Sequence, residues 1–436
     1  MAEMSSPRQT QTATSSAAAS FGAAAKRKTC RSCGGSRLDT IFADLGVQPP
    51  ANSYLRDLDA AANECAFPLR AVVCADCFLV QVDTDVPREQ LFFDYAYFSS
   101  YSESWLRHAK AYSDTAIARF DLKASSFVIE VASNDGYLLQ NFVAAGIPCL
   151  GIEPSSSVAL AAKSKGIPTE IAFLDSSTAG TVLAKHAQAD LVIANNVWAH
   201  VPDLNSFTAA IARLLRPNGT LTIEVQHLLP LMQRSEFDTI YHEHYSYFSL
   251  LAAERLLARH ALKVFQVEEL STHGGSLRYY IVHSERTDVG EHESLLAMRA
   301  AEATAGLSEL DTYQAFAAQM APCRDALRRF LAETKLEQKR VAAYGAAAKG
   351  NTFLNYCGIG RDDIALVADR NVHKQGRLLP GSHIPILPPT SLLELRPDYV
   401  LILAWNLKDE IMQQLAALRR SGTQFVTAIP SLKIWA

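Results

Sequence analysis

Short apolar runs alternate with longer mixed segments through the middle of the chain. The runs cover residues 126–133, 148–154, 190–196, 220–226, 262–270 and 277–284. Between them, helical segments are predicted at 137–145 and from about residue 203. Runs that are apolar at nearly every position are typical of strands buried on both faces. The alternation predicts a doubly wound parallel sheet, which is an α/β fold.

A second α/β pattern follows in the last third of the chain. Residues 291–339 are rich in alanine and charge, and they predict helices that connect two lobes. An apolar run then leads into the small-residue turn Gly345-Ala-Ala-Ala-Lys-Gly-Asn-Thr352, and another apolar run ends in Asp369. We therefore expect two α/β domains, at residues 91–290 and 291–436.

Composition places the chain among ordinary globular proteins. Of its 436 residues, 49% are hydrophobic and 20% are charged, and the net charge of −4 argues against a general nucleic-acid binder. No apolar run is long enough to cross a membrane. Eight cysteines in a chain of this length do not form a disulfide framework. We expect a monomer in the reducing cytoplasm, with neither nucleic acid nor membrane as a partner.

The first 28 residues lack periodicity and are rich in Ser, Thr, Ala and Gln, which predicts a disordered tail. The basic cluster Lys26-Arg27-Lys28 follows an alanine run instead of preceding it, the wrong order for a secretory signal. A transit peptide remains open as an alternative, because Glu3 is the one acid in this tail.

Two cysteine pairs predict a metal site near the N-terminus. Cys30-Arg-Ser-Cys33-Gly-Gly and Cys74-Ala-Asp-Cys77 have the spacing typical of tetrahedral zinc. Four thiolates leave no open position on the metal, so we expect a structural Zn²⁺ in a domain spanning residues 29–90. Unrelated free thiols, or a redox pair, are the weaker alternatives.

Polar residues gather where the predicted strands end, which is where doubly wound sheets bind ligands. An acid, Glu153, ends the second strand 17 residues after Gly136, a position suited to ribose hydroxyls. No GxGxxG is present, which favours S-adenosylmethionine (SAM) over a dinucleotide, although Ala132 stands where most methyltransferases have glycine. A domain whose turns are merely polar is the alternative. The candidate cofactor-binding residues are Glu130, Ser133, Asp135, Gly136, Glu153 and Asn195.

The segment Tyr241-His-Glu-His-Tyr245 combines two imidazoles, a carboxylate and phenols within a few residues. Imidazole suits proton transfer near neutral pH, and phenols can donate to a developing oxyanion. An aromatic loop with solvated polar tips is the alternative, as is a metal bound by His242 and His244. Upstream, Tyr95 and Tyr97 share one strand face and are candidates to line a cleft.

Several segments together give a more specific signal. In order they are Glu130-Val-Ala-Ser-Asn-Asp-Gly136, Gly151-Ile-Glu-Pro-Ser155, Asn195-Asn-Val-Trp-Ala-His-Val-Pro-Asp203, Tyr241-His-Glu-His-Tyr245 and His273-Gly-Gly-Ser-Leu-Arg278. With the cysteine pairs, they resemble the sugar-nucleotide C-methyltransferases of deoxysugar biosynthesis, from about residue 29 to the end of the chain. The resemblance implies an N-terminal zinc domain, a SAM-binding Rossmann-like domain and a second Rossmann-like domain for the sugar nucleotide.

The C-terminal turn fits a nucleotide in its own right. Backbone amides at the start of its helix, with Lys349 nearby, suit a diphosphate, and NAD is an alternative ligand. The resemblance extends the substrate site to further residues. The expected substrate-binding set is Tyr95, Tyr97, Ser276, Arg278, Gly345, Lys349, Asn351, Thr352 and Asp369.

Methyl transfer to carbon needs a carbanion equivalent, which a 4-keto sugar provides by losing a proton next to its ketone. We expect His244 to be the base, with Glu243 and Tyr241 positioning it or the substrate, as the resemblance also implies. His200 is the candidate to stabilise the enolate oxygen. C3 is the family's usual site and C5 an alternative. An O-methyltransferase, an NAD-linked sugar-nucleotide oxidoreductase and a non-catalytic zinc protein are competing functions.

Overall fold

The N-terminal part of the chain forms a small sheet that borrows a strand from the middle of the sequence. The computed structural model describes residues 25–87, 91, 99–101 and 103–435. Strands β2 (Thr40–Gln48), β3 (Phe67–Val73), β4 (Val80–Val82) and β11 (Ser246–Tyr247) pair antiparallel in the order β11-β4-β3-β2. A short helix α1 (Leu58–Ala61) lies between β2 and β3. Because β11 directly follows Tyr245, the Tyr-His-Glu-His segment is fastened to the N-terminal sheet at its end.

The predicted tail is partly ordered. Strand β1 (Ala25–Lys26) pairs with β5 (Thr84–Asp85), and Arg27 forms an ion pair with Asp85 at 3.0 Å. The expectation of disorder over the first 28 residues is therefore wrong for this stretch. Residues 1–24 lie outside the described part of the chain.

The middle domain contains a seven-stranded sheet in the order β12-β13-β10-β9-β6-β7-β8. Its strands are β6 (Val128–Val131), β7 (Cys149–Ile152), β8 (Thr169–Glu170), β9 (Ala189–Asn195), β10 (Leu215–Gln226), β12 (Leu262–Leu270) and β13 (Ser276–His283). The α/β prediction is confirmed, but the sheet is mixed, because β13 runs antiparallel to both β10 and β12. The connection from β12 to β13 is too short for the helical crossover that parallel strands require.

Helices cover this sheet and lead out of it. They are α3 (Glu103–Arg119), α4 (Leu139–Ala144), α5 (Ser156–Ser164), α6 (Ser176–Lys185), α7 (Leu204–Leu214), α8 (Leu228–Gln233) and α9 (Leu250–Ala258). Short 3₁₀ turns η1 (Ser99–Tyr101), η2 (Trp198–His200), η3 (Phe237–Thr239) and η4 (Thr272–Gly274) lie at the connections. Two of these turns, η2 and η3, lead into the segments that carry the candidate histidines.

The C-terminal domain is built on a six-stranded sheet in the order β16-β15-β14-β17-β18-β19. Its elements are β14 (Val341–Tyr344), α12 (Ala348–Cys357), β15 (Val367–Ala368), β16 (Ile386–Leu387), α13 (Thr390–Leu395), β17 (Tyr399–Ile402), η5 (Trp405–Leu407), α14 (Lys408–Gln414), α15 (Ala416–Arg420), β18 (Gln424–Thr427) and β19 (Lys433–Trp435). The first five strands are parallel, and β19 adds an antiparallel edge. This arrangement agrees with the predicted second Rossmann-like domain.

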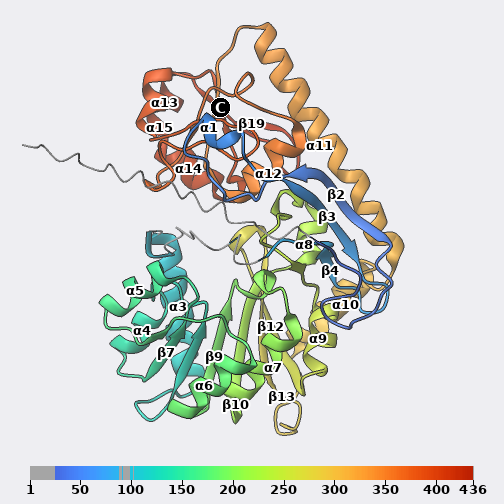
Figure 1. Cartoon of the computed structure of the whole chain (residues 1–436), viewed down its shortest axis with the longest axis vertical. Helices are drawn as coiled ribbons and strands as arrows, with labels where there is room; N and C mark the ends of the chain where they lie inside the picture. The colour runs from blue at the N-terminus through green and yellow to red at the C-terminus, as the bar shows by residue number, and fades with distance from the viewer. Residues whose placement is uncertain (1–24, 88–90, 92–98, 102, 436) are drawn as a thin grey trace, which may run out of the picture.

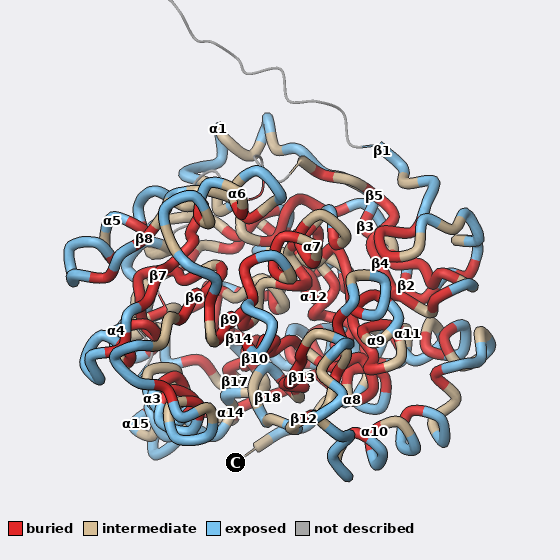
Figure 2. Tube along the Cα trace, turned by 90° about the horizontal axis from the view of Figure 1, so that it is seen from below, coloured by how far each residue is buried: buried red, intermediate tan, exposed pale blue. Residues whose placement is uncertain are grey.

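Two helices, α10 (Glu293–Thr304) and α11 (Leu310–Leu336), connect the lobes. Figure 1 shows the seven-stranded sheet below, the six-stranded sheet above, and α11 along one side with β2 and β3. The ring of Phe42 on β2 stacks on Phe316 of α11 at 4.4 Å between centroids. One cluster of buried apolar residues extends through all three parts, and Figure 2 shows the buried strands inside and exposed helices outside. Among the described residues, no helix is long and apolar enough to cross a membrane.

Candidate functional site

The four predicted zinc ligands come together. The Sγ atoms of Cys30, Cys33, Cys74 and Cys77 all lie within 4.8 Å of one another, and two of the pairs are 3.5 Å apart. Zn–S bonds of about 2.3 Å in a tetrahedron place sulfur atoms about 3.8 Å apart, so the cluster has the size of a Zn²⁺ site. All four ligands are protein thiolates, and the metal is therefore structural. No other such cluster occurs in the described parts of the chain, which leaves His242 and His244 without a metal-binding set.

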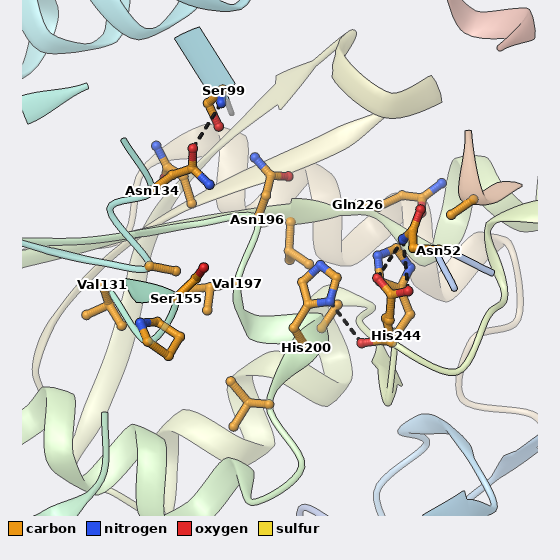
Figure 3. A pocket seen from close by; sticks show the side chains of 18 of the residues that line it. Asn52, Ser99, Val131, Asn134, Ser155, Asn196, Val197, His200, Gln226 and His244 are labelled. Atoms are coloured by element: carbon orange, nitrogen blue, oxygen red, sulfur yellow. Dashed lines mark hydrogen bonds between the residues drawn. The ribbon is translucent and has the colours of Figure 1, made fainter. Parts of the chain in front are cut away.

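One cavity of about 390 Å³ lies where the three domains meet. Its wall includes strand ends of the seven-stranded sheet, residues from the Tyr-His-Glu-His segment, and the start of α12. Figure 3 shows Asn134 and Ser155 toward one end, and His200, His244 and Asn52 together toward the other. The sequence predicted two separate ligand sites, and the structure joins them in one space.

At the first end, the carboxylate of Glu153 lies beyond the last residue of β7 and lines the cavity. The backbone N–H of Asn134 donates to Oε2 at 2.9 Å, and the N–H of Ser155 donates to Oε1 at 2.8 Å. Burial raises the pKa of Glu153 to about 6, against the effect of these two donors. Each carboxylate oxygen keeps a second lone pair, so Glu153 can accept hydrogen bonds from a ribose.

The turn after β6 adopts backbone conformations that favour glycine. Ala132 has φ of 56° and Asn134 has φ of 51°. The alanine at position 132, where the motif usually has glycine, therefore occupies a strained left-handed conformation. Such strain is maintained where the surroundings fix the backbone, and both residues line the cavity.

The remaining predicted cofactor residues fall into two groups. Asn195 lines the cavity with its neighbour Asn196, whose side-chain Nδ2 is buried without a hydrogen-bond partner in the described structure. Four others lie behind the wall and shape the turn: Glu130, Ser133, Asp135 and Gly136. Burial, with Glu153 and Asp135 nearby, raises the pKa of Glu130 well above its ordinary value. Asp135 forms an ion pair with Lys165 at 3.1 Å.

At the second end, the imidazole of His244 is held through both nitrogens. Its Nδ1 lies 3.0 Å from the carbonyl oxygen of Thr239, and its Nε2 lies 2.7 Å from the hydroxyl of Tyr241. A carbonyl can only accept, so Nδ1 carries the proton and Nε2 accepts from the phenol. Burial, with His200 nearby, lowers the pKa of His244 well below its ordinary value. His244 is therefore neutral, with a proton-accepting nitrogen in the cavity.

His200 packs against His244 with ring centroids 4.7 Å apart. Its Nδ1 donates to the backbone carbonyl of Glu243 at 2.9 Å, and burial lowers its pKa to about 4. In this neutral form Nε2 is an acceptor. The role of His200 in stabilising the enolate oxygen stays a prediction, and in this form of the ring the one N–H, on Nδ1, is engaged by the carbonyl of Glu243.

Glu243 brings a buried carboxylate to the same end of the cavity. Burial raises its pKa to about 7. Both of its oxygens lie 2.8 Å from Nδ2 of Asn52, which comes from the loop after β2. His242, by contrast, points away from the cavity and packs edge-on against Phe67 at 6.0 Å. Three residues of the segment, Tyr241, Glu243 and His244, thus line the cavity, while His242 packs in the core.

The C-terminal domain contributes the start of α12. Lys349 lines the cavity, donates to Oδ1 of Asn406 at 2.6 Å, and lies 4.5 Å from the ring centre of Trp405. Asp369 does not reach the cavity, because its carboxylate accepts from the N–H groups of Ala346 and Asn371, each at 2.7 Å. Gly345, with φ of 93°, supports the same turn, and Asn351 and Thr352 are buried within α12.

Two predicted substrate residues, Ser276 and Arg278, lie elsewhere. The guanidinium of Arg278 forms ion pairs with Glu224 at 2.7 Å and Glu268 at 2.9 Å, on the two strands beside β13. The hydroxyl of Ser276 donates to the carbonyl of Thr272 at 3.1 Å. Neither lines the cavity. Tyr95 and Tyr97 lie outside the described residues.

The cavity also contains residues that sequence reasoning did not select. They are Asn52, Trp105, Asn196, Gln226 and His273. His273 belongs to the quoted His-Gly-Gly segment and has φ of 57°, so its motif offered a signal. Asn52 offered none, because it lies far away in sequence on a loop without a motif.

Comparison with known proteins gives three matched family models in chain order. They are described as "Putative zinc binding domain" at residues 30–92, "Methyltransferase domain" at 104–267 and "C-methyltransferase C-terminal domain" at 271–430. The C-methyltransferase NovU of Streptomyces niveus is 34% identical over 409 residues, covering 93% of this chain and 96% of that protein.

Other similarities are partial. A ubiquinone biosynthesis O-methyltransferase of Rhodopseudomonas palustris (strain BisA53) is 25% identical over 117 residues, covering 25% of this chain and 46% of that protein. Among solved structures, the magnesium protoporphyrin IX methyltransferase ChlM of Synechocystis PCC 6803 with bound SAH has 13% identity and a TM-score of 0.34. That match covers 45% of this chain and 93% of that one.

Proposed function

This chain belongs to the C-methyltransferase family, and we propose that it methylates C3 of a nucleotide-linked 4-keto-6-deoxy sugar. Membership favours carbon as the acceptor over the hydroxyl of an O-methyltransferase. It leaves no role for an NAD-linked oxidoreductase or a non-catalytic zinc protein. One observation carries the proposal: the Tyr241–His244 hydrogen bond lies in the same cavity as Glu153 and Lys349.

The cofactor end of the cavity fits SAM. Glu153 is placed to accept hydrogen bonds from the ribose hydroxyls, and Asn195 and Asn196 offer amide groups at the end of β9. The apolar wall of Ile152 and Leu174 suits the adenine ring. SAM supplies an electrophilic methyl group on a positively charged sulfur. The residues of this chain have to orient that group and create a carbon nucleophile.

Enolisation changes two adjacent groups of the sugar, the ketone oxygen and the neighbouring C–H, and Tyr241 and His244 provide one partner for each. A ketone oxygen accepts a hydrogen bond, and the hydrogen on the neighbouring carbon is removed as a proton. If the sugar enters between the two side chains, the ketone replaces Nε2 as the acceptor of the Tyr241 hydroxyl. That exchange releases the lone pair of Nε2 to take the proton from C3.

The surrounding groups fix the tautomer and the protonation state of His244. The Nδ1–H of His244 remains on the carbonyl of Thr239 and fixes the tautomer, a common device for orienting a catalytic imidazole. The low pKa of His244 keeps it neutral before substrate enters, and the enolate then stabilises the imidazolium. Tyr241 takes the role of donor to the enolate oxygen, because neutral His200 has no proton available for it.

The nucleoside diphosphate is assigned to the start of α12. Lys349 and Lys374 line this part of the cavity, and helix-start amides favour phosphate oxygens. Two acids, Glu236 and Asp238, lie close to Lys349 and partly oppose its charge. Burial and the proximity of Asp238 raise the pKa of Glu236 to about 8, so that this acid is protonated near neutral pH and opposes an anion less.

A methyl-transfer assay tests the proposal. The protein with SAM is incubated with a panel of nucleoside-diphosphate 4-keto-6-deoxy sugars and the matching 4-hydroxy sugars, and each product is analysed by NMR. We expect a new methyl group on C3, and only with the 4-keto sugars. A methyl group on oxygen, on C5, or on the 4-hydroxy sugars would contradict it.

A further inference from the structure

The loop after β2 brings polar side chains from the zinc domain into contact with both lobes. Nδ2 of Asn52 lies 2.8 Å from each oxygen of Glu243 in the middle domain. The hydroxyl of Tyr54 donates to the carbonyl of Ala346 in the C-terminal domain at 2.7 Å, and it lies 3.1 Å from Oδ1 of Asn52. Lys374 donates to the same carbonyl at 2.7 Å. The zinc domain therefore contacts both lobes, and its Asn52 lines the cavity between them.

We propose that Asn52 is a positioning residue for methyl transfer, through which the zinc domain keeps the Glu243 carboxylate ionised and directed into the cavity. This inference rests on the proposed function. The zinc site is more than 15 residues away in sequence on either side, and its metal has no open position. The domain thus acts on the reaction through its fold and this loop, and not through the metal.

The hydrogen-bond pattern favours a carboxylate. The amide Nδ2 is a donor only, and it faces both oxygens of Glu243. A protonated carboxyl would place its own O–H against this donor and lose one of the two contacts. Donors to the charged form of an acid favour that form. On the other side of the amide, Oδ1 lies 3.1 Å from the hydroxyl of Tyr54.

Burial acts in the opposite direction and is the larger effect, so the contacts of the carboxylate limit the rise of its pKa without reversing it. Burial raises the pKa of Glu243 to about 7, while the hydrogen bonds from Asn52 and the charge of Lys374 lower it. Other groups facing this region are Tyr54, on the same loop, and Asp369, beside Lys374. His200 contacts the Glu243 backbone. Asn52 and Lys374 are therefore the two groups in this set that favour the ionised form.

An ionised Glu243 serves the step that His244 performs. Its carboxylate lines the cavity together with His244, and its oxygens can accept from a sugar hydroxyl and so hold the sugar against the base. Tyr54 adds a link to the backbone just before Lys349, where the sugar nucleotide is assigned. The loop thereby sets the distance between the base and the substrate-binding domain.

The isosteric variant Asn52→Asp separates a positioning role from a packing role. It keeps the shape of the side chain and replaces the donor by an acceptor. The control is Asn63→Asp, which adds the same charge to an exposed position of the same domain. The kinetic readouts are kcat, KM and the pH profile of kcat, with zinc content and SAM affinity measured alongside.

We expect Asn52→Asp to lower kcat about tenfold or more and to move the acid limb of its profile upward by about one pH unit or more. Zinc content and SAM affinity stay at wild-type values, and Asn63→Asp behaves as the wild type. Tyr54→Phe gives a smaller loss, because it removes a contact of Asn52 and not Asn52 itself. An active wild type whose Asn52→Asp variant has the same kcat and pH profile would overturn the inference.

A second measurement needs no substrate and so separates this inference from the proposed function. Thermal unfolding is followed for the wild type, Asn52→Ala, Glu243→Gln and the double variant at about pH 5.5 and about pH 8.5. We expect the two substitutions to be coupled at the higher pH and nearly additive at the lower one, where Glu243 is protonated. Additive effects at both values would overturn the inference. An inactive wild type with this coupling intact would instead contradict the proposed sugar substrate.

Discussion

The hydroxyl of Tyr241 donates to Nε2 of His244 across 2.7 Å, within a turn whose backbone bond joins the N–H of His244 to the carbonyl of Tyr241 at 2.9 Å. The two side chains are thus preorganised against each other before any substrate enters. A ketone substrate can take over both partners of this hydrogen bond. Its oxygen accepts from the Tyr241 hydroxyl, and Nε2 of His244 is then released to take the acidic hydrogen on the neighbouring carbon. The chemistry assigned to the cavity follows from this pair.

Replacing His244 by alanine removes the proton acceptor. We expect kcat to fall about a hundredfold or more, because a positioned acid–base group typically contributes that factor. SAM binding, measured by calorimetry, should remain, since Glu153 lies toward the other end of the cavity. The control is His186→Ala, a histidine that does not line the cavity. Turnover of His244→Ala at the wild-type rate would remove this residue from the mechanism.

Replacing Tyr241 by phenylalanine keeps the ring and removes the donor. We expect kcat to fall about tenfold to a hundredfold with little change in KM, since the phenol acts mainly on the developing enolate oxygen. Steady-state kinetics on the purified variant checks this split. A rise in KM at an unchanged kcat would show that Tyr241 binds the sugar without stabilising the transition state.

Replacing Glu153 by alanine removes the acceptor assigned to the ribose. We expect SAM affinity to fall by about 1.5–3 kcal/mol, the range for hydrogen bonds to a charged group. Its matched control is Glu170→Ala at the end of the next strand, β8, where the carboxylate pairs with Lys185 at 2.8 Å on the surface. Equal SAM affinities in the two variants, measured by calorimetry, would show that Glu153 is not a ligand.

Loss of zinc should disable the catalytic segment. Strand β11 follows Tyr245 directly and pairs with β4 of the zinc domain, so the metal and the segment share one sheet. Structural zinc contributes on the order of 10 kcal/mol to small domains. We expect Cys74→Ser to lose zinc, lower the unfolding temperature and abolish turnover, while the exposed Cys65→Ser does none of these. Metal analysis, thermal unfolding and turnover provide the readouts, and an active Cys74→Ser without zinc would contradict this account.

The buried acid Glu236 makes stability depend on pH. Its pKa is raised from 4.5 to about 8 by burial and by Asp238, so the folded state holds a proton that the unfolded state releases. Stability is therefore lost as pH rises from about 4.5 to about 8. We expect Glu236→Gln to be more stable than the wild type at about pH 8, by on the order of a few kcal/mol, with the difference vanishing below about pH 4.5. Measuring the free energy of unfolding at several pH values checks this, and the exposed Glu309→Gln is the control. A stability difference between Glu236→Gln and the wild type that does not change with pH would contradict the proton linkage.

Sequence reasoning located the features that depend on local spacing and on the ends of strands. The cysteine spacing predicted the zinc cluster, and the strand-end rule placed Glu153 and Asn195 at the cavity. Sequence reasoning failed where contacts between distant parts of the chain decide whether a side chain is available to a ligand. The family resemblance implied that Arg278 binds the substrate, but its guanidinium forms ion pairs with Glu224 and Glu268 on the two neighbouring strands.

Contacts between distant parts of the chain also explain why Asn52 was not predicted and why Asp369 does not line the cavity. Asn52 reaches Glu243 across 191 positions of sequence, and only the folded chain shows that contact. Asp369 ends a strand at the ligand edge of its sheet, yet backbone N–H groups already occupy its oxygens. A residue at a strand end becomes a ligand only if its neighbours leave it available. The sequence of this chain does not encode those neighbours locally.

Solvent exchange at the sugar carbon tests the central claim most directly. The wild type is incubated in D₂O with a 4-keto sugar nucleotide and S-adenosylhomocysteine, which donates no methyl group, and NMR follows deuterium at each carbon beside the ketone. We predict that deuterium enters at C3, more slowly with Tyr241→Phe and not at all with His244→Ala. A wild type that methylates this sugar but exchanges no hydrogen at C3, or a His244→Ala variant that exchanges it at the wild-type rate, would contradict the account.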